Sequence, residues 1–562
     1  MRKTTKILVV ALSVLVGVPV ALFVLSFAMG AYLYVTADFL QPRVGVEVGK
    51  YELSVDNDSL RICDNSTLLL NKYGLWEAHI SGDPSERGVK YGVLCKDLLR
   101  SQEDFFVKQI HEMIPSNWWV KFLHKLIIIS NRNMAQHIPE RYRDEISAIS
   151  LFCTEDYNIY GKPYVRQLNY HAAHDIGHAM QEYMLVGCSS FACWGGQSES
   201  GELVVGRNFD FYVGDDFAKN KIILFVEPEE GYKFASISWP GMMGVLSGMN
   251  EEGLTITINA AKGKIPTSSA MPISLLAREI LQFASNIDEA YAIAQKFETF
   301  VSESLLIGSA KDGCAAIIEK TPENIALYKS DNSRVVCTNH YQSSEFVHDA
   351  YNVENIATSD SAYRHERINE LLDAALPLTT EEAVAILRNR YGKGGSDIGL
   401  SNEKSINQFI AHHSVVFEPS KLRFWVTTSP WQLGEYVCYD LNTVFNRSTP
   451  TAQSYVQSKY NVTSDGAALN DEYERVCRYR EHYKVIASAI KEGRNISSEY
   501  KDEFIADNPN YFQVYNLLGD YEAAQGNYAG AVSYWQKALT LEISRTTERE
   551  AIIIKIQRYD QR

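Results

Sequence analysis

The chain lacks the features that mark several large classes of protein. Only 9 cysteines and 16 prolines occur in 562 residues, which excludes a disulfide-dense scaffold and a collagenous or proline-rich chain. Basic residues are outnumbered: 54 lysines and arginines face 69 aspartates and glutamates, so the formal net charge is −15. Because binding to phosphates requires a basic face, we predict no nucleic-acid partner. Nine cysteines is an odd number, so at least one thiol stays unpaired within a monomer.

A long uncharged run lies close to the N-terminus. It extends from Ile7 to Val35 and exceeds the roughly 20 apolar residues that a helix needs to cross a bilayer. Arg2, Lys3 and Lys6 precede it, and such a basic flank stays in the cytoplasm. We therefore expect residues 1–37 to form a signal anchor and transmembrane helix, with the catalytic part outside the cytoplasm (periplasmic if bacterial). Secretion after signal-peptide cleavage is the alternative.

The remaining chain alternates between helix-type and strand-type sequence patterns. Residues 38–75 are polar and are expected to form a linker, whereas 85–150 carry apolar residues at helical spacing, with Ser101 as a helix cap. From Cys188 to about residue 340, short β-type runs alternate with glycine and asparagine turns, and strand patterns return within 413–427. This alternation predicts an α/β fold in which helices cover sheets.

The pair Gly187-Cys188 stands directly before a β-type run and suggests a nucleophile. A cysteine at a new N-terminus offers a thiolate that can attack carbonyls and an α-amine that titrates near pH 8 and can act as base. The amine exists only if the Gly187–Cys188 bond is cut. The same thiol can make that cut by attacking the Gly187 carbonyl, and the missing Cβ eases the strained turn that this requires. The alternative is that Cys188 is a small buried residue.

Two charged residues follow in the next β-type run. Asp210 would hold the α-amine of Cys188 by a charge-assisted hydrogen bond. Arg207 would favour the thiolate electrostatically. The alternative for this pair is a local contact at the surface.

These residues resemble the cysteine class of N-terminal nucleophile hydrolases, and most closely the acyl-CoA:6-aminopenicillanate acyltransferase family. The resemblance runs from about Gly74 to Leu433 and includes the upstream segment 81–88. It implies an αββα four-layer sandwich, with 38–187 as a propeptide-like α-chain region and 188–440 as the catalytic core. It also implies self-cleavage between Gly187 and Cys188.

The resemblance further implies roles for three more residues. Asn259 would support the oxyanion site, and Asn339 would donate its side-chain amide to the developing oxyanion, a contribution of about 2.7–4 kcal/mol. Arg364 would contact the active site. The alternative for Asn259 is an amide that satisfies backbone groups at a strand end. His340 follows Asn339, but the α-amine already fills the role of base.

The C-terminal residues 511–562 have the spacing of one tetratricopeptide-like repeat and a helical cap. The matching positions are Tyr515, Leu518, Gly519, Gly526, Tyr528, Ala531, Trp535 and Ala538. Because about three repeats are needed for independent stability, we expect this helical hairpin to dock on the catalytic body after a connecting segment, 441–510. It offers a binding element for a protein partner.

Together these features predict a self-cleaving amidohydrolase or acyltransferase. It would act on the carbon–nitrogen bond of small N-acyl amides through a Cys188 thioester. We expect no organic cofactor and no metal: His171, His174 and His178 share one helical face, but no zinc-binding glutamate motif or cysteine pair accompanies them. The alternatives are a cysteine dipeptidase of the same superfamily and a non-catalytic envelope scaffold that uses the helical repeat.

Overall fold

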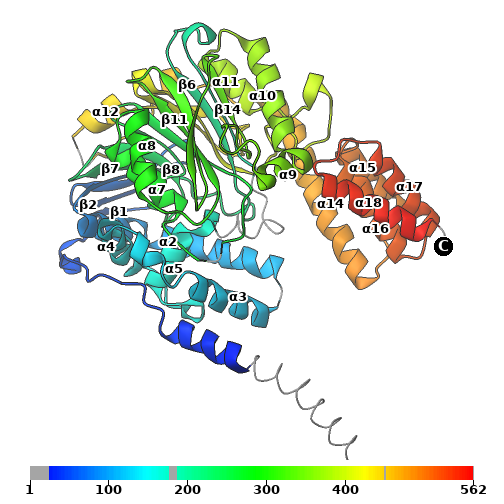
Figure 1. The fold of residues 1–562 in the computed structure, drawn as a ribbon, viewed down its shortest axis with the longest axis horizontal. Helices are drawn as coiled ribbons and strands as arrows, with labels where there is room; N and C mark the ends of the chain where they lie inside the picture. Colours follow the sequence, from blue (N-terminus) through cyan, green and yellow to red (C-terminus); the bar gives the residue numbers. More distant parts are fainter. Residues whose placement is uncertain (1–23, 115, 176–186, 267, 449–450, 561–562) are drawn as a thin grey trace, which may run out of the picture.

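Two β-sheets lie face to face at the centre of the molecule, and helices cover their outer surfaces (Figure 1). The computed structural model describes residues 24–114, 116–175, 187–266, 268–448 and 451–560. The first sheet has 11 strands in the order β1-β2-β3-β4-β7-β8-β9-β10-β11-β12-β13. These strands are β1 (Leu53–Asp56), β2 (Leu60–Cys63), β3 (Ser66–Leu70), β4 (Trp76–Gly82), β7 (Ile222–Pro228), β8 (Phe234–Ser238), β9 (Ser247–Asn250), β10 (Leu254–Ala260), β11 (Glu303–Ser309), β12 (Cys314–Lys320) and β13 (Ile325–Lys329).

The second sheet is smaller and carries the candidate nucleophile at one of its ends. It has 6 strands in the order β14-β5-β6-β15-β16-β17, all of them antiparallel to their neighbours. These strands are β14 (Arg334–Cys337), β5 (Ser189–Cys193), β6 (Val204–Asp210), β15 (Ala411–Glu418), β16 (Arg423–Thr427) and β17 (Tyr436–Asp440). A buried cluster from both sheets fills the space between them.

Helices form the two outer layers of the sandwich. The larger sheet is covered by α2 (Pro84–Met113), α4 (Glu140–Ser150), α5 (Pro163–His171), α7 (Ile273–Phe283) and α8 (Ile287–Lys296). The smaller sheet is covered by α10 (Ser361–Ala375) and α11 (Thr380–Leu387). Each sheet therefore has one face against helices and one against the other sheet, which is the four-layer α/β arrangement.

Strand β10 shows how alternating side chains of one strand face a helix layer on one side and the other sheet on the other side. All of its residues are buried, and it alternates between apolar and small polar side chains. Ile256 and Ile258 belong to the core beneath α7. Thr257 and Asn259 face the other sheet, where both contact Ser190 of β5. The period-two alternation of a strand thus delivers the polar residues to the interior near the nucleophile.

Helix α2 begins where local sequence signals place it. Asp83 accepts from the backbone of Glu86 and forms a capping box, and Pro84 occupies the first turn. The helix then continues without a break through Ser101, whose hydroxyl donates to the carbonyl oxygen of Leu98 at 3.1 Å. The expected helix cap at Ser101 is therefore wrong, because a serine inside a helix can satisfy its hydroxyl on the preceding turn.

The expectation of a linker over residues 38–75 is also wrong. This stretch contributes β1, β2 and β3 to the edge of the larger sheet, followed by β4. β4 pairs in parallel with β7, which lies far along the sequence. Strands at an edge keep a half-exposed face, so β1 alternates between partly buried and exposed residues and has a polar composition.

The expectation of a transmembrane helix is also corrected by the structure. Across the described part of the chain, no helix combines the length and the apolar character that crossing a membrane requires. The described portion of the expected anchor is helical over 24–35. Residues 1–23 of the predicted anchor lie outside the described residues. Within the described residues, the fold is an α/β sandwich without a membrane-spanning helix.

The C-terminal helices form a separate layer at one side of the sandwich (Figure 1). They are α14 (Glu472–Glu492), α15 (Ser498–Asp507), α16 (Phe512–Ala524), α17 (Tyr528–Leu539) and α18 (Thr546–Tyr559). The hairpin α16–α17 is closely packed: a Cβ added at Gly519 would lie 2.4 Å from Nε1 of Trp535. Helices α14 and α15 share one hydrophobic core with this hairpin.

Polar contacts attach this helical unit to the sandwich. Asn508 and Leu400 exchange two hydrogen bonds of 2.8 and 2.9 Å, and Asn402 donates to the carbonyl oxygen of Glu542 at 3.0 Å. Arg545 lies 3.8 Å from the carboxylate of Asp360, which directly precedes α10. The helical unit therefore reaches the surroundings of the candidate site.

Candidate active site

The candidate nucleophile lies at the beginning of β5, beside the end of β6. The two strands are antiparallel neighbours, with Ser189 opposite Asn208. The backbone N–H of Gly187 donates to the carbonyl oxygen of Asp210 at 3.2 Å. Cys188 and Asp210 are both fully buried, at 0% exposure. The sheet register thus brings Asp210 next to the Gly187–Cys188 peptide bond.

Arg207 reaches the thiol of Cys188. Its Nη2 donates to Sγ at 3.6 Å, while Nη1 donates to the hydroxyl of Ser247 at 2.6 Å. The ring of Phe209 lies 4.4 Å from the guanidinium carbon. Burial raises the pKa of the Cys188 thiol to about 11, and the charge of Arg207 opposes that rise. The thiol of the intact chain is therefore protonated at neutral pH.

Asp210 has a buried carboxyl group that can accept further hydrogen bonds. Within the described residues, neither of its carboxylate oxygens has a hydrogen-bond partner. Burial raises its pKa to about 8, although Arg364 and Arg207 act in the opposite direction. Buried polar groups are nearly always hydrogen-bonded, so this carboxyl group can accept from a partner that the described residues do not provide.

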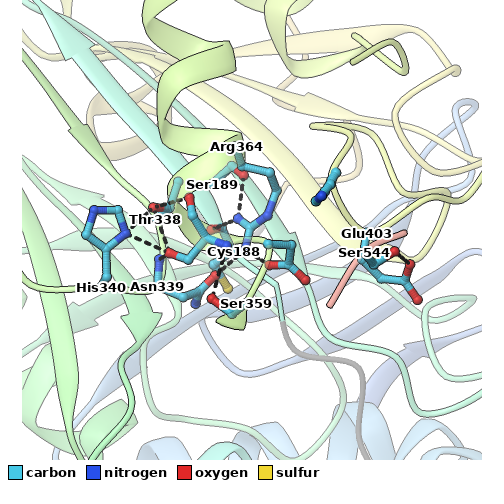
Figure 2. Close-up of polar contacts among 12 residues, drawn as sticks. Cys188, Ser189, Thr338, Asn339, His340, Ser359, Arg364, Glu403 and Ser544 are labelled. Carbon is cyan, nitrogen blue, oxygen red and sulfur yellow. Dashed lines mark hydrogen bonds and ion pairs between the residues drawn. The ribbon is translucent and has the colours of Figure 1, made fainter. Parts of the chain in front are cut away.

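Arg364 is the hub of the polar network around the nucleophile (Figure 2). Its Nη1 donates to the carbonyl oxygen of Cys188 at 2.7 Å and to the hydroxyl of Ser189 at 3.0 Å. Its Nη2 donates to Oδ1 of Asn339 at 2.6 Å and to the carboxylate of Asp360 at 2.8 Å. The guanidinium fork therefore fixes the backbone of the nucleophile and an asparagine side chain together.

The two asparagines are engaged with the protein itself. Asn339 donates through Nδ2 to the carbonyl oxygen of Ala260 at 2.8 Å. Asn259 donates to the carbonyl oxygens of Cys337 and Thr338 at 2.9 and 3.2 Å, and accepts from Ser190 at 3.0 Å. These amides connect β10 with β14 and β5 in the intact chain. The oxyanion roles of both residues stay predictions.

Three residues near the candidate nucleophile were not assigned to the site by the sequence analysis. Ser247 and His413 contact each other at 2.8 Å, and His413 Nε2 lies 3.3 Å from Nη1 of Arg207. Asp360 pairs with Arg364. Ser247 carries no local signal. His413 belongs to a strand pattern that indicated the fold alone, and its position follows from the pairing of β15 with β6.

Two further histidines from the sequence analysis, His340 and His171, form contacts within the fold. His340 shares hydrogen bonds with Thr338 and Ser361 at 3.2 and 2.8 Å, to one side of Cys188 (Figure 2). His171 contacts the carbonyl oxygen of Gln167 at 2.8 Å and the N–H of Met243 at 3.0 Å. His178 lies outside the described residues. Among those that are described, no three histidine, cysteine or acidic side chains are grouped to hold a metal ion.

A family model matches part of the chain. Residues 197–429, less than half of the chain, match the model of the acyl-coenzyme A:6-aminopenicillanic acid acyl-transferase family. In this stretch, which contains Arg207, Asp210, Asn259, Asn339 and Arg364, the chain is similar to a family of N-terminal nucleophile enzymes that act on amide bonds. Gly187 and Cys188 precede the matched residues.

Two curated proteins are similar over much of the chain. An uncharacterized protein of Archaeoglobus fulgidus is 23% identical over 408 residues, which are 64% of this chain and 65% of that protein. Protein dcd1B of Dictyostelium discoideum is 23% identical over 272 residues, 45% of this chain and 52% of its own length. The chain therefore spans less than two thirds of either relative.

Two solved structures are also similar to part of the chain. An N-acylethanolamine-hydrolyzing acid amidase ortholog of Caenorhabditis elegans has 14% identity and a TM-score of 0.30, and covers 42% of this chain and 93% of its own. A mutant of conjugated bile acid hydrolase from Clostridium perfringens has 12% identity and a TM-score of 0.30, and covers 46% of this chain and 93% of its own.

Proposed function

We propose that this chain is an amidohydrolase or acyltransferase that cuts its own Gly187–Cys188 bond and then processes N-acyl amides through a Cys188 thioester. The observation that carries the proposal is the carboxyl group of Asp210 beside that peptide bond, which has no hydrogen-bond partner among the described residues. Cleavage turns the backbone nitrogen of Cys188 into an α-ammonium group, which is a strong donor. A charge-assisted hydrogen bond to Asp210 would then satisfy both groups.

The self-cleavage step uses groups of two adjacent residues. The thiol of Cys188 attacks the carbonyl carbon of Gly187 and forms a carbon–sulfur bond. The carbon–nitrogen bond breaks, and the thiol proton moves to the departing nitrogen. Water then hydrolyses the thioester, which leaves a carboxylate on Gly187 and regenerates the thiol.

The surroundings of Gly187 support this step. A Cβ there would lie 3.1 Å from Nε2 of Gln408 and 3.7 Å from Nη2 of Arg364. The approach to Gln408 is tighter than an ordinary van der Waals contact, whereas the distance to Arg364 is an ordinary one. A larger residue at this position would therefore crowd the amide of Gln408.

Turnover would repeat the same chemistry on an external amide. The freed α-amine takes the thiol proton, and the thiolate beside Arg207 attacks the carbonyl carbon of the substrate. The amine half leaves with a proton, so the acyl half remains as a thioester. Water or a second amine then attacks this thioester, which gives hydrolysis or transfer.

N-terminal sequencing of the purified protein tests the proposal. We expect two fragments, the second of which begins at Cys188, and a single intact chain for Cys188→Ala. Cys193→Ala is the matched control, because this buried cysteine lies at the other end of β5 and is expected to leave cleavage unchanged.

The test has outcomes that would reject the proposal. A new N-terminus at another residue, or cleavage that persists in Cys188→Ala, would overturn the mechanism. A panel of acyl amides and dipeptides then separates the proposed activity from that of a dipeptidase. A chain that stays intact and turns over neither class of substrate would favour the non-catalytic scaffold.

A further inference from the structure

A cavity of about 350 Å³ lies between the sandwich and helix α14. Four segments line it: the loop between β6 and β7, the start of β15, the loop between β16 and β17, and α14 of the C-terminal unit. Its volume lies within the range of small-molecule sites. The helical unit therefore completes a pocket that the sandwich alone would leave open on one side.

The cavity and the candidate nucleophile lie on the same sheet. Ala411, which lines the cavity, pairs with Asp210, and the carbonyl oxygen of Asp210 accepts the N–H of Gly187. Two strand spacings therefore separate the cavity wall from the backbone of Gly187, which amounts to about 10 Å. Cys188 itself is fully buried and does not line the cavity.

One buried cation in this cavity has no acidic partner. Lys221 is 4% exposed, and its ammonium donates to the carbonyl oxygen of Thr427 at 3.0 Å. Among the described residues it forms no ion pair, and burial lowers its pKa to about 7. A buried ammonium without a counter-charge is costly, and an anionic ligand would relieve that cost.

The other charges that line the cavity are already compensated. Arg480 donates to the carboxylate of Asp215 at 2.9 Å, and Glu481 lies 3.3 Å from Lys484. Lys219 pairs with Asp216 in the same loop. The acids of the wall are thus neutralised, so Lys221 is left as the excess charge.

His412 adds an unused polar atom to the same wall. It is 1% exposed, and within the described residues its Nε2 has no hydrogen-bond partner. Its Nδ1 lies 2.9 Å from Nδ1 of His413, whose Nε2 lies 3.3 Å from Arg207. Since Arg207 contacts the thiol, the cavity and the nucleophile are joined by a continuous polar chain.

Aromatic side chains supply an apolar side to the cavity. The rings of Trp431 and Tyr473 lie 5.5 Å apart at 62°, and the guanidinium of Arg480 lies 4.6 Å from the ring of Trp431. The cavity therefore combines an apolar surface with an uncompensated cation. This combination suits an organic acid better than an inorganic ion.

We propose that this cavity binds a carboxylate of the amide substrate, held by Lys221 and His412, so that the enzyme acts on N-acyl amides that carry an acid group. This specificity rests on the proposed function. The carboxylate can belong to the amine half, as in an N-acyl amino acid, or to the acyl half, as in the monoamide of a dicarboxylic acid.

Turnover of three matched amides distinguishes these sources. The substrates are N-decanoylglycine, the mono-N-methylamide of decanedioic acid, and neutral N-methyldecanamide. We expect one of the two acids to exceed the neutral amide about tenfold in kcat/KM, and the preferred acid identifies the half that carries the charge. The proposal would be overturned if the neutral amide were turned over at least as fast as each of the two acids.

Substitutions of two lysines, one inside and one outside the cavity, provide the matched test. Lys221→Met should reduce the preference for the acid to within about twofold, mainly through KM. Lys329→Met removes an exposed lysine of β13 that lies 3.8 Å from Asp288 and does not line the cavity, and should retain the preference. His412→Asn retains an amide near the position of Nδ1 and removes Nε2, so it should weaken the preference partially without disturbing His413.

Binding without catalysis separates this proposal from the proposed function. Calorimetry with hexanoate, which has no amide bond, should detect binding to the full-length wild-type chain and to Lys329→Met. Binding to Lys221→Met should be about tenfold weaker, and 1-hexanol should bind equally to all three. Unchanged hexanoate binding in Lys221→Met would overturn the site, whereas selective loss without any amide turnover would reject only the proposed function.

Discussion

The guanidinium of Arg207 and the thiol of Cys188 meet in a contact that is fully buried, with 3.6 Å between Nη2 and Sγ. Burial raises the pKa of this thiol, and the positive charge of Arg207 lowers it. The same arginine donates to Ser247, which contacts His413. The reactivity of Cys188 therefore depends on a side chain held by residues from both sheets.

Replacement of Arg207 by methionine should make Cys188 less reactive. Without the guanidinium charge, the pKa of the thiol should rise further, and each unit lowers the thiolate fraction tenfold. We expect the alkylation rate of Cys188 at pH 8, followed by mass spectrometry of its peptide, to fall about tenfold. Alkylation of Cys193 in the same protein is the internal reference, and Arg207→Lys should preserve part of the rate. Equal rates in all three proteins would contradict a role for this charge.

Asp210 should make the stability of the intact chain depend on pH. Its pKa is about 8 in the folded chain and about 3.9 in an unfolded chain, so the folded state binds more protons between these values. Stability from this group is therefore present below about pH 4 and is lost as the pH rises to 8, by at most about 1.4 kcal/mol per unit.

Urea unfolding of two uncleaved proteins checks this effect of pH. Cys188→Ala is the reference, and Cys188→Ala with Asp210→Asn removes the titration. We expect the double variant to gain stability relative to the reference at pH 8.5 compared with pH 5. A constant difference between the two proteins at both pH values would show that Asp210 does not titrate in this range.

Substitution of Gly187 should slow self-cleavage by crowding. A Cβ at this position approaches Nε2 of Gln408 to 3.1 Å, so Gly187→Val should reduce the cleavage rate at least tenfold. Gln408→Ala should restore part of that rate in the double variant, because it removes the obstructing amide. Gly196→Ala is the control, since its Cβ would meet no atom within 4 Å. Failure of Gln408→Ala to rescue cleavage would mean that crowding is not the cause.

A side chain at position 519 should destabilise the helical unit. The added Cβ of Gly519→Ala would lie 2.4 Å from Nε1 of Trp535, and overpacking of this kind typically costs about 1–3 kcal/mol. Thermal unfolding followed by circular dichroism measures this loss. Gly526 meets no atom within 4 Å but has a φ of +81°, so Gly526→Ala tests backbone strain instead of crowding. An unchanged Tm for Gly519→Ala would contradict close packing of the hairpin.

Much of the local structure follows from neighbouring residues alone. The apolar runs after Gly187 and around Thr255 form strands, because alternating side chains suit a sheet that is buried on both faces. The start of α2 follows from the capping box at Asp83. Errors occur where context decides: Ser101 lies inside a helix, and the polar stretch 38–75 forms edge strands. The transmembrane helix expected from the apolar run is not found among the described residues, because none of the described helices is both long enough and apolar enough to cross a membrane.

The sequence alone predicted the candidate nucleophile, its glycine neighbour and the alternation of β-type and helical stretches after Cys188, because these depend on residues a few positions apart. The groups that meet Cys188 follow from the tertiary structure. Arg364 reaches its carbonyl oxygen from a helix 176 residues away, and Asn259 uses its amide on β14. The cavity likewise joins Lys221, His412 and Arg480 from distant segments. Side chains far apart in a chain are brought together by sheet register and helix packing, and these are properties of the whole fold.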